Sequence, residues 1–226
     1  MKQVSFNPRY IDFYKNFFDN EERAHSLLSK CYLLSETYID DEELVKPRRI
    51  VNNIARLLGI ADELRANRHG GYGLQIHFWM ICIEAIVNIA TPSRRKKIAI
   101  VRQFFIEFIP DEDQQFLLRH FTRLITDERW FNSPQLDISI IASIFYAIRN
   151  DVVHDGEYSD FHFSDSNDNP TQNILKLREF DNDSFEPRHY HVTVTYEQMR
   201  TIMIRACLYF LSERIKLSEE YINKLR

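Results

Sequence analysis

The segment that most constrains the fold of this 226-residue chain is residues 74–90, which are apolar on nearly every side when drawn as a helix. A helix without a polar face has to be surrounded by other elements, so it belongs at the centre of a structure. The longest apolar run, residues 78–90, contains Glu84 and Asn88 and is too short to span a bilayer. We therefore expect residues 74–90 to form the central helix of a helical bundle.

Apolar residues recur at helical spacing along most of the remaining chain, and only 5 Gly and 7 Pro interrupt them. The spacing predicts two helices within residues 8–38, broken near Asp19-Asn20, and the acidic residues 39–46 predict a linker. Pro47 suits the first turn of a following helix. The predicted helices after this linker are residues 47–65, 74–90, 93–108, 111–126, 135–154 and 196–215, with loops at 69–73 and 130–134.

The stretch before the last helix has a different composition. Residues 158–187 are rich in Asp, Asn and Ser, with one strand-like run at 173–177, and residues 189–195 alternate with the period of two that is typical of a strand. A short hairpin within a polar insertion at 158–195 is the prediction. The expected fold is all-α: a helical bundle over residues 46–226, an N-terminal helical extension over 1–45, and a small β-hairpin-like insertion before the last helix.

Charge and cysteine content narrow the class of protein. The net charge is −4, so contact with nucleic acid would have to come from a local basic patch and not from a broad positive field. Cys31, Cys82 and Cys207 form no CxxC pair, which indicates free thiols in a reducing cytosol. The first 14 residues lack the apolar core of a signal peptide. We expect a cytoplasmic protein without membrane association, and no cofactor.

The main candidate for chemistry is Ile-Arg-Asn-Asp-Val-Val-His-Asp-Gly at residues 148–156, at the end of the predicted helix 135–154. Arg149, Asn150 and His154 supply a guanidinium, an amide and an imidazole, the groups that hold a phosphodiester and transfer protons around it. Gly156 offers a place for the helix to end. The structural alternative is a helix end at which His154 meets the dipole and Arg149 caps carbonyl groups.

The spacing of these residues limits how they can act together. On an ideal helix Asn150 and His154 share a face, whereas Arg149 and His154 are about 140° apart. One ligand could contact both only if the last turn loosens or if a second chain supplies part of the site.

Arg149-Asn150-x3-His154 followed by Gly156 resembles the Arg-polar-x3-His signature of the HEPN superfamily, and its flanking pattern is most similar to the ApeA-like branch. Residues 78–86, an apolar segment with Glu84 embedded, resemble the upstream helix of such domains. The resemblance covers residues 74–215, with a poor match between 158 and 191. It implies a HEPN-type helical bundle, and residues 1–45 have no counterpart in it.

The resemblance also implies an activity: metal-independent cleavage of single-stranded RNA to 2′,3′-cyclic phosphate and 5′-hydroxyl ends. His154 would transfer protons, Arg149 would stabilise charge on the phosphate, and Asn150 would orient His154 or bind the phosphate. HEPN proteins typically dimerise with their motifs facing each other, which implies a homodimer with the site at its interface. A defence or toxin module with an inhibitory protein partner is a further expectation. The alternative is a non-catalytic HEPN module that binds a nucleotide, RNA or a protein.

Four other features have two interpretations each. Glu84 could orient Arg149 or His154, or it could form a structural salt bridge with any Arg. The basic run Arg94, Arg95, Lys96 and Lys97 could contact RNA, although such runs are usually solvated helix surface. His189 and His191 could bind a metal with His162 or His154, but ordinary strand histidines are favoured and no metal is expected. The glycines at 70–73 could cradle a phosphate, but a plain turn is favoured.

Overall fold

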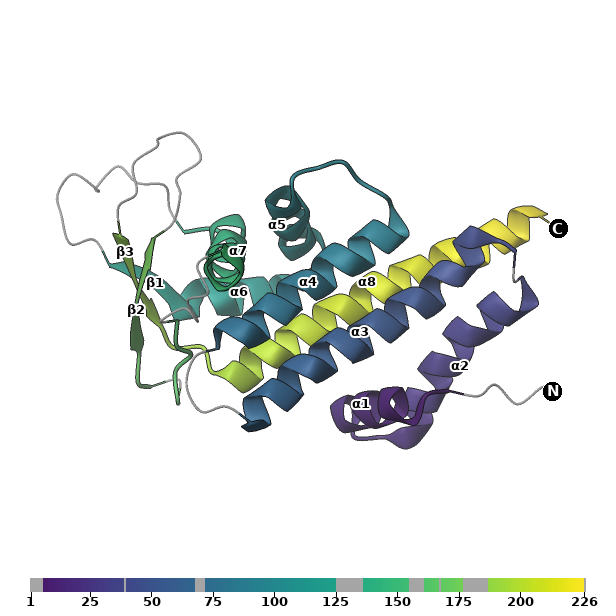
Figure 1. Ribbon diagram of the computed structural model, residues 1–226, viewed down its shortest axis with the longest axis horizontal. Coiled ribbons are helices and arrows are strands. Elements are labelled where there is room, and N and C mark those ends of the chain that lie inside the picture. The colour runs from purple at the N-terminus through teal and green to yellow at the C-terminus, as the bar shows by residue number, and fades with distance from the viewer. Residues whose placement is uncertain are drawn as a thin grey trace.

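The computed structural model describes residues 6–38, 40–67, 72–124, 136–154, 161–166, 168–176 and 187–225 (Figure 1). The described elements, in chain order, are α1 (Pro8–Phe18), α2 (Glu21–Thr37), α3 (Glu42–Asn67), α4 (Gly73–Ala90), α5 (Lys97–Phe108), α6 (Asp111–His120), β1 (Phe121–Leu124), α7 (Ile138–His154), β2 (Thr171–Lys176), β3 (Pro187–Val192) and α8 (Tyr196–Leu225). The fold is mostly helical with one small antiparallel sheet, which confirms the predicted all-α class with a small insertion.

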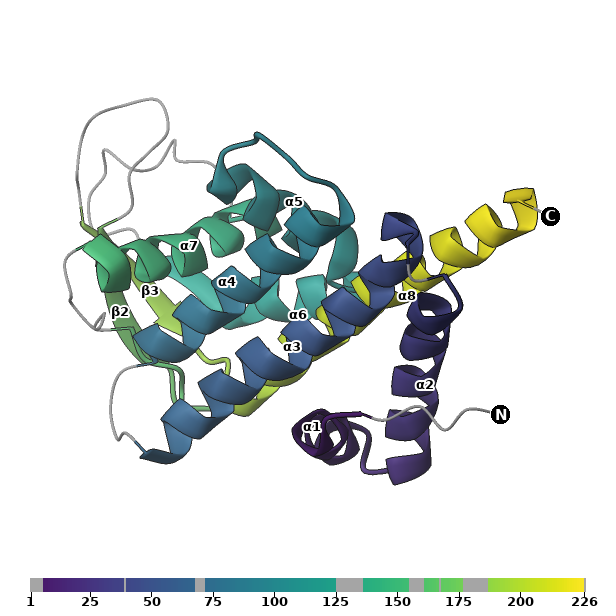
Figure 2. The ribbon, with the colours of Figure 1, turned by 45° about the vertical axis from the view of Figure 1, so that its right-hand side comes forward.

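The helix predicted to be central, α4, contacts α3, α5, α7 and α8. Its Trp79, Met80 and Ile83 side chains are fully buried. Figures 1 and 2 show α3, α4 and α8 running together along the length of the molecule, with the sheet at one end. By length and hydropathy alone α4 could cross a membrane, but 56% of it is buried inside the protein, and core helices of soluble proteins pass the same test.

The two N-terminal helices are separated where the sequence predicts. Asp19 has a left-handed backbone (φ 49°) that ends α1, and the side chain of Asn20 accepts a hydrogen bond from the first turn of α2. Both helices pack on α3, and Tyr14 Oη donates to the Val51 carbonyl at 2.7 Å. The domain boundary expected at residue 45 falls inside α3.

The prediction of a linker at residues 39–46 is wrong, because α3 already begins at Glu42. Asp41 Oδ1 accepts a hydrogen bond from the Glu43 backbone N–H at 3.0 Å, which satisfies one of the free donors of the first turn. Two glutamates in that turn also favour a helix start, since the N-terminal end of the helix dipole is positive. Pro47 therefore lies inside the helix and not in its first turn.

The small sheet has one strand more than the predicted hairpin. β2 and β3 pair antiparallel, as expected for the insertion, and β1 pairs with the other edge of β3, giving the order β1-β3-β2. The helix predicted over 111–126 thus ends at His120. Phe121 is buried opposite Val192 and Thr122 is exposed, the alternation of a strand that covers the core on one face.

Three further predictions concern helix ends and thiols. The helix predicted from residue 93 begins at Lys97, so Arg94, Arg95 and Lys96 lie in the segment before it. Clustered cations are disfavoured in a first helical turn, where the dipole is positive. The last helix continues past residue 215 to Leu225. The three cysteines are free, as predicted, and all three are buried. Of the loop predicted at 69–73, residues 69–71 lie outside the described residues and α4 already begins at Gly73. The loop predicted at 130–134 lies outside the described residues.

Candidate functional site

Arg149 and Glu84 meet where α7 packs against α4. Arg149 follows Ile148 and lies one turn after Phe145, both fully buried, so it belongs to the face of α7 that turns inward. The residue is 9% exposed, and Glu84 on α4 is 7% exposed. Arg149 Nε lies 3.6 Å from Glu84 Oε1, which makes a buried ion pair between two helices 65 positions apart in the chain.

The two atoms of this ion pair, Arg149 Nε and Glu84 Oε1, are not joined by a hydrogen bond. A separation of 3.6 Å is longer than an N–H···O bond, and both atoms are inaccessible and without a hydrogen-bond partner. Buried polar atoms are normally hydrogen-bonded, and an unpaired one calls for an explanation such as a bound water or ion or a catalytic role. The Arg149 Nε–H is therefore held near Glu84 by the ion pair but donates no hydrogen bond.

A second cation shares the same carboxylate. Lys97, the last residue of the basic run, places Nζ 3.3 Å from Glu84 Oε2, while its side chain remains 57% exposed. Glu84 thus faces a buried guanidinium on one oxygen and a solvent-accessible ammonium on the other. Two positive charges around one negative charge leave a local excess of one positive charge, which favours an anion next to Arg149.

The Arg149 side chain is also held by two neighbours on its own helix. Its Nη1 donates to Asn150 Oδ1 at 3.1 Å, and its guanidinium carbon lies 5.6 Å from the centre of the Tyr146 ring. Burial raises the pKa of Tyr146; the negative charge of Glu84 acts in the same direction and Arg149 opposes it. The phenol stays protonated, so it adds no negative charge to the site.

His77 is a member of this cluster that the sequence analysis missed. It precedes Glu84 by seven residues on α4, which is two turns, so both lie on one side of the helix. Burial lowers the pKa of His77 and the charge of Arg149 lowers it further, against a hydrogen bond to the Arg149 backbone and the charge of Glu84. The imidazole is therefore neutral at pH 7, and its Nδ1 is buried without a hydrogen-bond partner.

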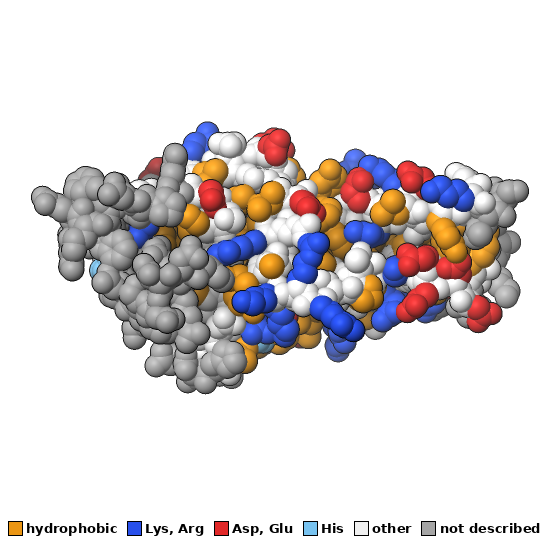
Figure 3. Space-filling view, turned by 90° about the horizontal axis from the view of Figure 1, so that it is seen from above, with side chains coloured by type: hydrophobic (Ala, Val, Ile, Leu, Met, Phe, Trp, Pro, Cys, Tyr) orange, Lys and Arg blue, Asp and Glu red, His pale blue; other side chains and the backbone are white. Residues whose placement is uncertain are grey.

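The structure does not bring the other candidate residues into contact with Arg149 and Glu84 among the residues that it describes. α7 ends at His154, but the side chain of His154 lies outside the described part of the structure. Arg94, Arg95 and Lys96 are exposed, and Arg95 donates to the neutral side chain of Gln103. On the face seen in Figure 3, Lys and Arg side chains gather across the middle of the molecule.

The histidines proposed as metal ligands do not form a cluster in the described structure. His189 lies on β3, and its Nδ1 is 3.2 Å from Gln172 Nε2. This nitrogen therefore pairs with an amide group and not with another potential metal ligand. His162 is exposed, and its backbone is paired with Asn173. Among the residues that the structure describes, no group of three or more His, Cys, Asp or Glu side chains is arranged to hold a metal ion.

Comparison of this chain with protein-family models, curated proteins and solved structures found no match.

Replacing Glu84 with Gln should lower the free energy of unfolding by about 1–3 kcal/mol, because the buried Arg149 charge would lose its carboxylate while the side-chain shape is kept. Urea denaturation of the two proteins measures this difference. Glu107, an exposed glutamate on α5, is the matched control, and Glu107→Gln should change stability by less than about 0.5 kcal/mol. Equal stability of Glu84→Gln and the unmodified protein would show that the pair contributes nothing to folding.

Proposed function

We propose that this chain is a metal-independent endoribonuclease that cleaves single-stranded RNA. The observation that carries the proposal is the Arg149 guanidinium at the end of α7, which is oriented by Asn150 and Glu84 and has a buried N–H that is not hydrogen-bonded. The nearby ammonium of Lys97 adds a second cation that solvent can reach. The resemblance of Arg149-Asn150-x3-His154 to the HEPN signature supports the same chemistry.

The reaction begins with attack of an RNA 2′-hydroxyl on the adjacent phosphorus. A new O–P bond forms to the 2′-oxygen, the bond to the 5′-oxygen breaks, and the products are a 2′,3′-cyclic phosphate and a 5′-hydroxyl. His154 takes the 2′-hydroxyl proton or protonates the leaving oxygen, since a free imidazole has a pKa of about 6.5. Arg149 stabilises charge on the nonbridging oxygens through its paired N–H donors. Asn150 keeps the guanidinium in its plane.

The protein should be a homodimer in which the ends of the two α7 helices face each other. One His154 in each chain does not easily serve as both acid and base, and Arg149 and His154 are about 140° apart on an ideal helix. A twofold interface would bring two Arg149 and two His154 residues to one cleft. Size-exclusion chromatography with light scattering at micromolar concentration should give twice the mass of the 27.1 kDa chain.

Val153 offers a variant that tests the location of the interface. It lies in the last turn of α7 and is 47% exposed, a large apolar surface for an isolated chain. Val153→Asp should shift the protein to monomer, whereas Leu33→Asp, at a similarly exposed position on α2, should leave the dimer intact. A monomeric unmodified protein, or a dimer that Val153→Asp does not weaken, contradicts this arrangement.

A non-catalytic module that binds a nucleotide or RNA is the second candidate, and the burial of Arg149 is the observation that favours it. A guanidinium that already faces Glu84 and is 9% exposed reaches only a phosphate that enters the same pocket. Calorimetry with short RNAs, paired with cleavage assays in excess EDTA, separates the two functions. Binding without cleavage, lost in Arg149→Ala and kept in His154→Ala, would establish the module and exclude the enzyme.

A further inference from the structure

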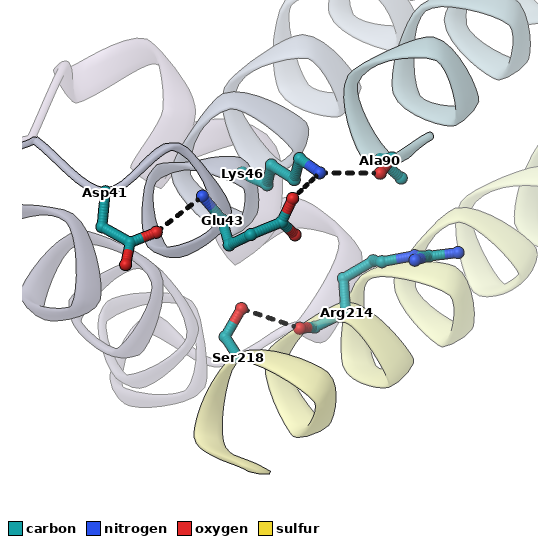
Figure 4. Close-up of polar contacts among 6 residues, drawn as sticks. All are labelled: Asp41, Glu43, Lys46, Ala90, Arg214 and Ser218. Atoms are coloured by element: carbon teal, nitrogen blue, oxygen red, sulfur yellow. Dashed lines mark hydrogen bonds and ion pairs between the residues drawn. The ribbon is translucent and has the colours of Figure 1, made fainter. Parts of the chain in front are cut away.

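We infer a second, separate ligand site: the cavity between the start of α3 and the last turns of α8 binds a small organic anion that carries a phosphate or carboxylate group. The cavity has a volume of about 280 Å³ and is bounded by Lys46 on α3 and by Arg214, Leu217, Tyr221 and Lys224 on α8. Figure 4 shows how Lys46 and Arg214 come from these two helices. This inference does not depend on the proposed nuclease function.

Arg214 is the feature that points to an anion. Its Nε is buried without a hydrogen-bond partner. Its guanidinium carbon lies 5.2 Å from the centre of the Phe210 ring, a contact that fixes the plane of the group but accepts no hydrogen bond. A buried charged donor is costly when unpaired, so an acceptor in the adjoining cavity would complete it.

On the α3 side of the cavity, opposite Arg214, the Lys46 ammonium is held in place by hydrogen bonds. Its ammonium donates to the Ala90 carbonyl at the end of α4 at 3.0 Å and to the Glu43 carboxylate, and its side chain is only 14% exposed (Figure 4). These contacts hold the ammonium at the cavity without neutralising the other cations. The lining contains three cations, Lys46, Arg214 and Lys224, and two carboxylates, Glu43 and Glu220. The lining therefore has a net positive charge.

The apolar part of the lining indicates that the anion is organic. Leu217 is 50% exposed and Tyr221 is 36% exposed, which leaves apolar surface beside the cations. The negative charge of Asp41 raises the pKa of Tyr221, with a hydrogen bond to the same carboxylate acting in that direction. The phenol thus stays neutral, and its ring is available for stacking. A volume of about 280 Å³ fits one small ring with its anionic group.

Calorimetry of the full chain with phenyl phosphate and with phenylacetate tests this site, and benzyl alcohol is the neutral probe. At least one of the two anions should bind and benzyl alcohol should not; the tighter anion identifies the acidic group. Arg214→Gln should weaken that affinity about tenfold or more, because a charge-assisted hydrogen bond is lost. Lys216→Gln is the matched control: Lys216 lies on the same helix, is 63% exposed and pairs with Glu213.

Melting temperatures measured with and without the anion distinguish a loss of binding from a loss of folding. The anion that binds should raise the melting temperature of the unmodified protein and of Lys216→Gln, but not that of folded Arg214→Gln or Arg214→Met. RNA cleavage by Arg214→Gln should equal that of the unmodified protein, which separates this site from Arg149. No binding of either anion at millimolar concentration, or equal affinity in the unmodified protein and Arg214→Gln, would overturn the inference.

Discussion

Replacing His154 with Ala should lower the rate of RNA cleavage by about 10²–10⁴-fold, the contribution that a positioned acid or base typically makes. In the proposed mechanism this variant loses the group that accepts the 2′-hydroxyl proton or protonates the leaving 5′-oxygen, while the Arg149 guanidinium would still bind the phosphate. RNA affinity should therefore stay close to that of the unmodified protein. Single-turnover cleavage of a labelled RNA, together with its dissociation constant, measures both quantities.

His25 provides the matched control for this substitution. It lies on α2, its Nε2 is 3.7 Å from Glu21, and its side chain is 46% exposed, so His25→Ala removes an imidazole away from α7. Its cleavage rate should be unchanged. Circular dichroism should show that both variants keep the helical content of the parent. A folded His154→Ala protein that cleaves at the parent rate would exclude His154 from the reaction.

Replacing Arg149 with Ala should reduce cleavage as severely, because the nonbridging oxygens lose their paired donors as charge develops. Arg149→Lys should recover little activity, since one ammonium cannot reproduce the planar fork. Unlike His154→Ala, both variants should also weaken RNA binding. The same assays, of single-turnover cleavage and RNA affinity, measure these effects.

Stability complicates this experiment and needs its own control. Arg149→Ala leaves the buried Glu84 carboxylate with only the exposed Lys97 as a partner, and removing one member of a buried pair can cost about 3–5 kcal/mol. The double variant Arg149→Met, Glu84→Gln removes both buried charges, so it should fold better than Arg149→Ala and still be inactive. Recovery of cleavage in this double variant would show that Arg149 acts through folding alone.

Elements whose packing follows directly from their own composition could be predicted from the local sequence. The apolar residues of α4 require burial on all sides, and α4 contacts four other helices. The break between α1 and α2 is carried by Asp19 and Asn20 themselves. The hairpin of the insertion was likewise visible, because alternation within residues 189–195 is a local property.

The third strand could not be predicted in this way. Residues 121–124 continue an amphipathic helical pattern, and they become a strand only because β3, about 70 residues later, supplies hydrogen-bond partners. The early start of α3 was predictable in principle, since Asp41 is a capping residue followed by two glutamates, but the acidic run suggested a linker instead.

The candidate site combines both situations. Arg149 and Asn150 could be identified from one segment, and Glu84 was identified as an unusual acid in an apolar helix. The 3.6 Å contact between Arg149 and Glu84 depends on how α7 packs on α4, which no local pattern determines. His77 was overlooked because a single histidine in an apolar helix is usually a core residue. Its spacing of seven residues from Glu84 was the available signal.

The most direct test of the nuclease proposal uses a DNA oligonucleotide that contains one ribonucleotide, incubated with the purified protein in excess EDTA. The protein should cut only on the 3′ side of the ribonucleotide, and mass spectrometry should find a 2′,3′-cyclic phosphate on one product and a 5′-hydroxyl on the other. An all-DNA oligonucleotide should remain intact, because it lacks the nucleophile. Cleavage of the all-DNA strand, a requirement for added divalent metal, or no cleavage of single-stranded RNA at any pH from 5 to 9 would contradict the proposal.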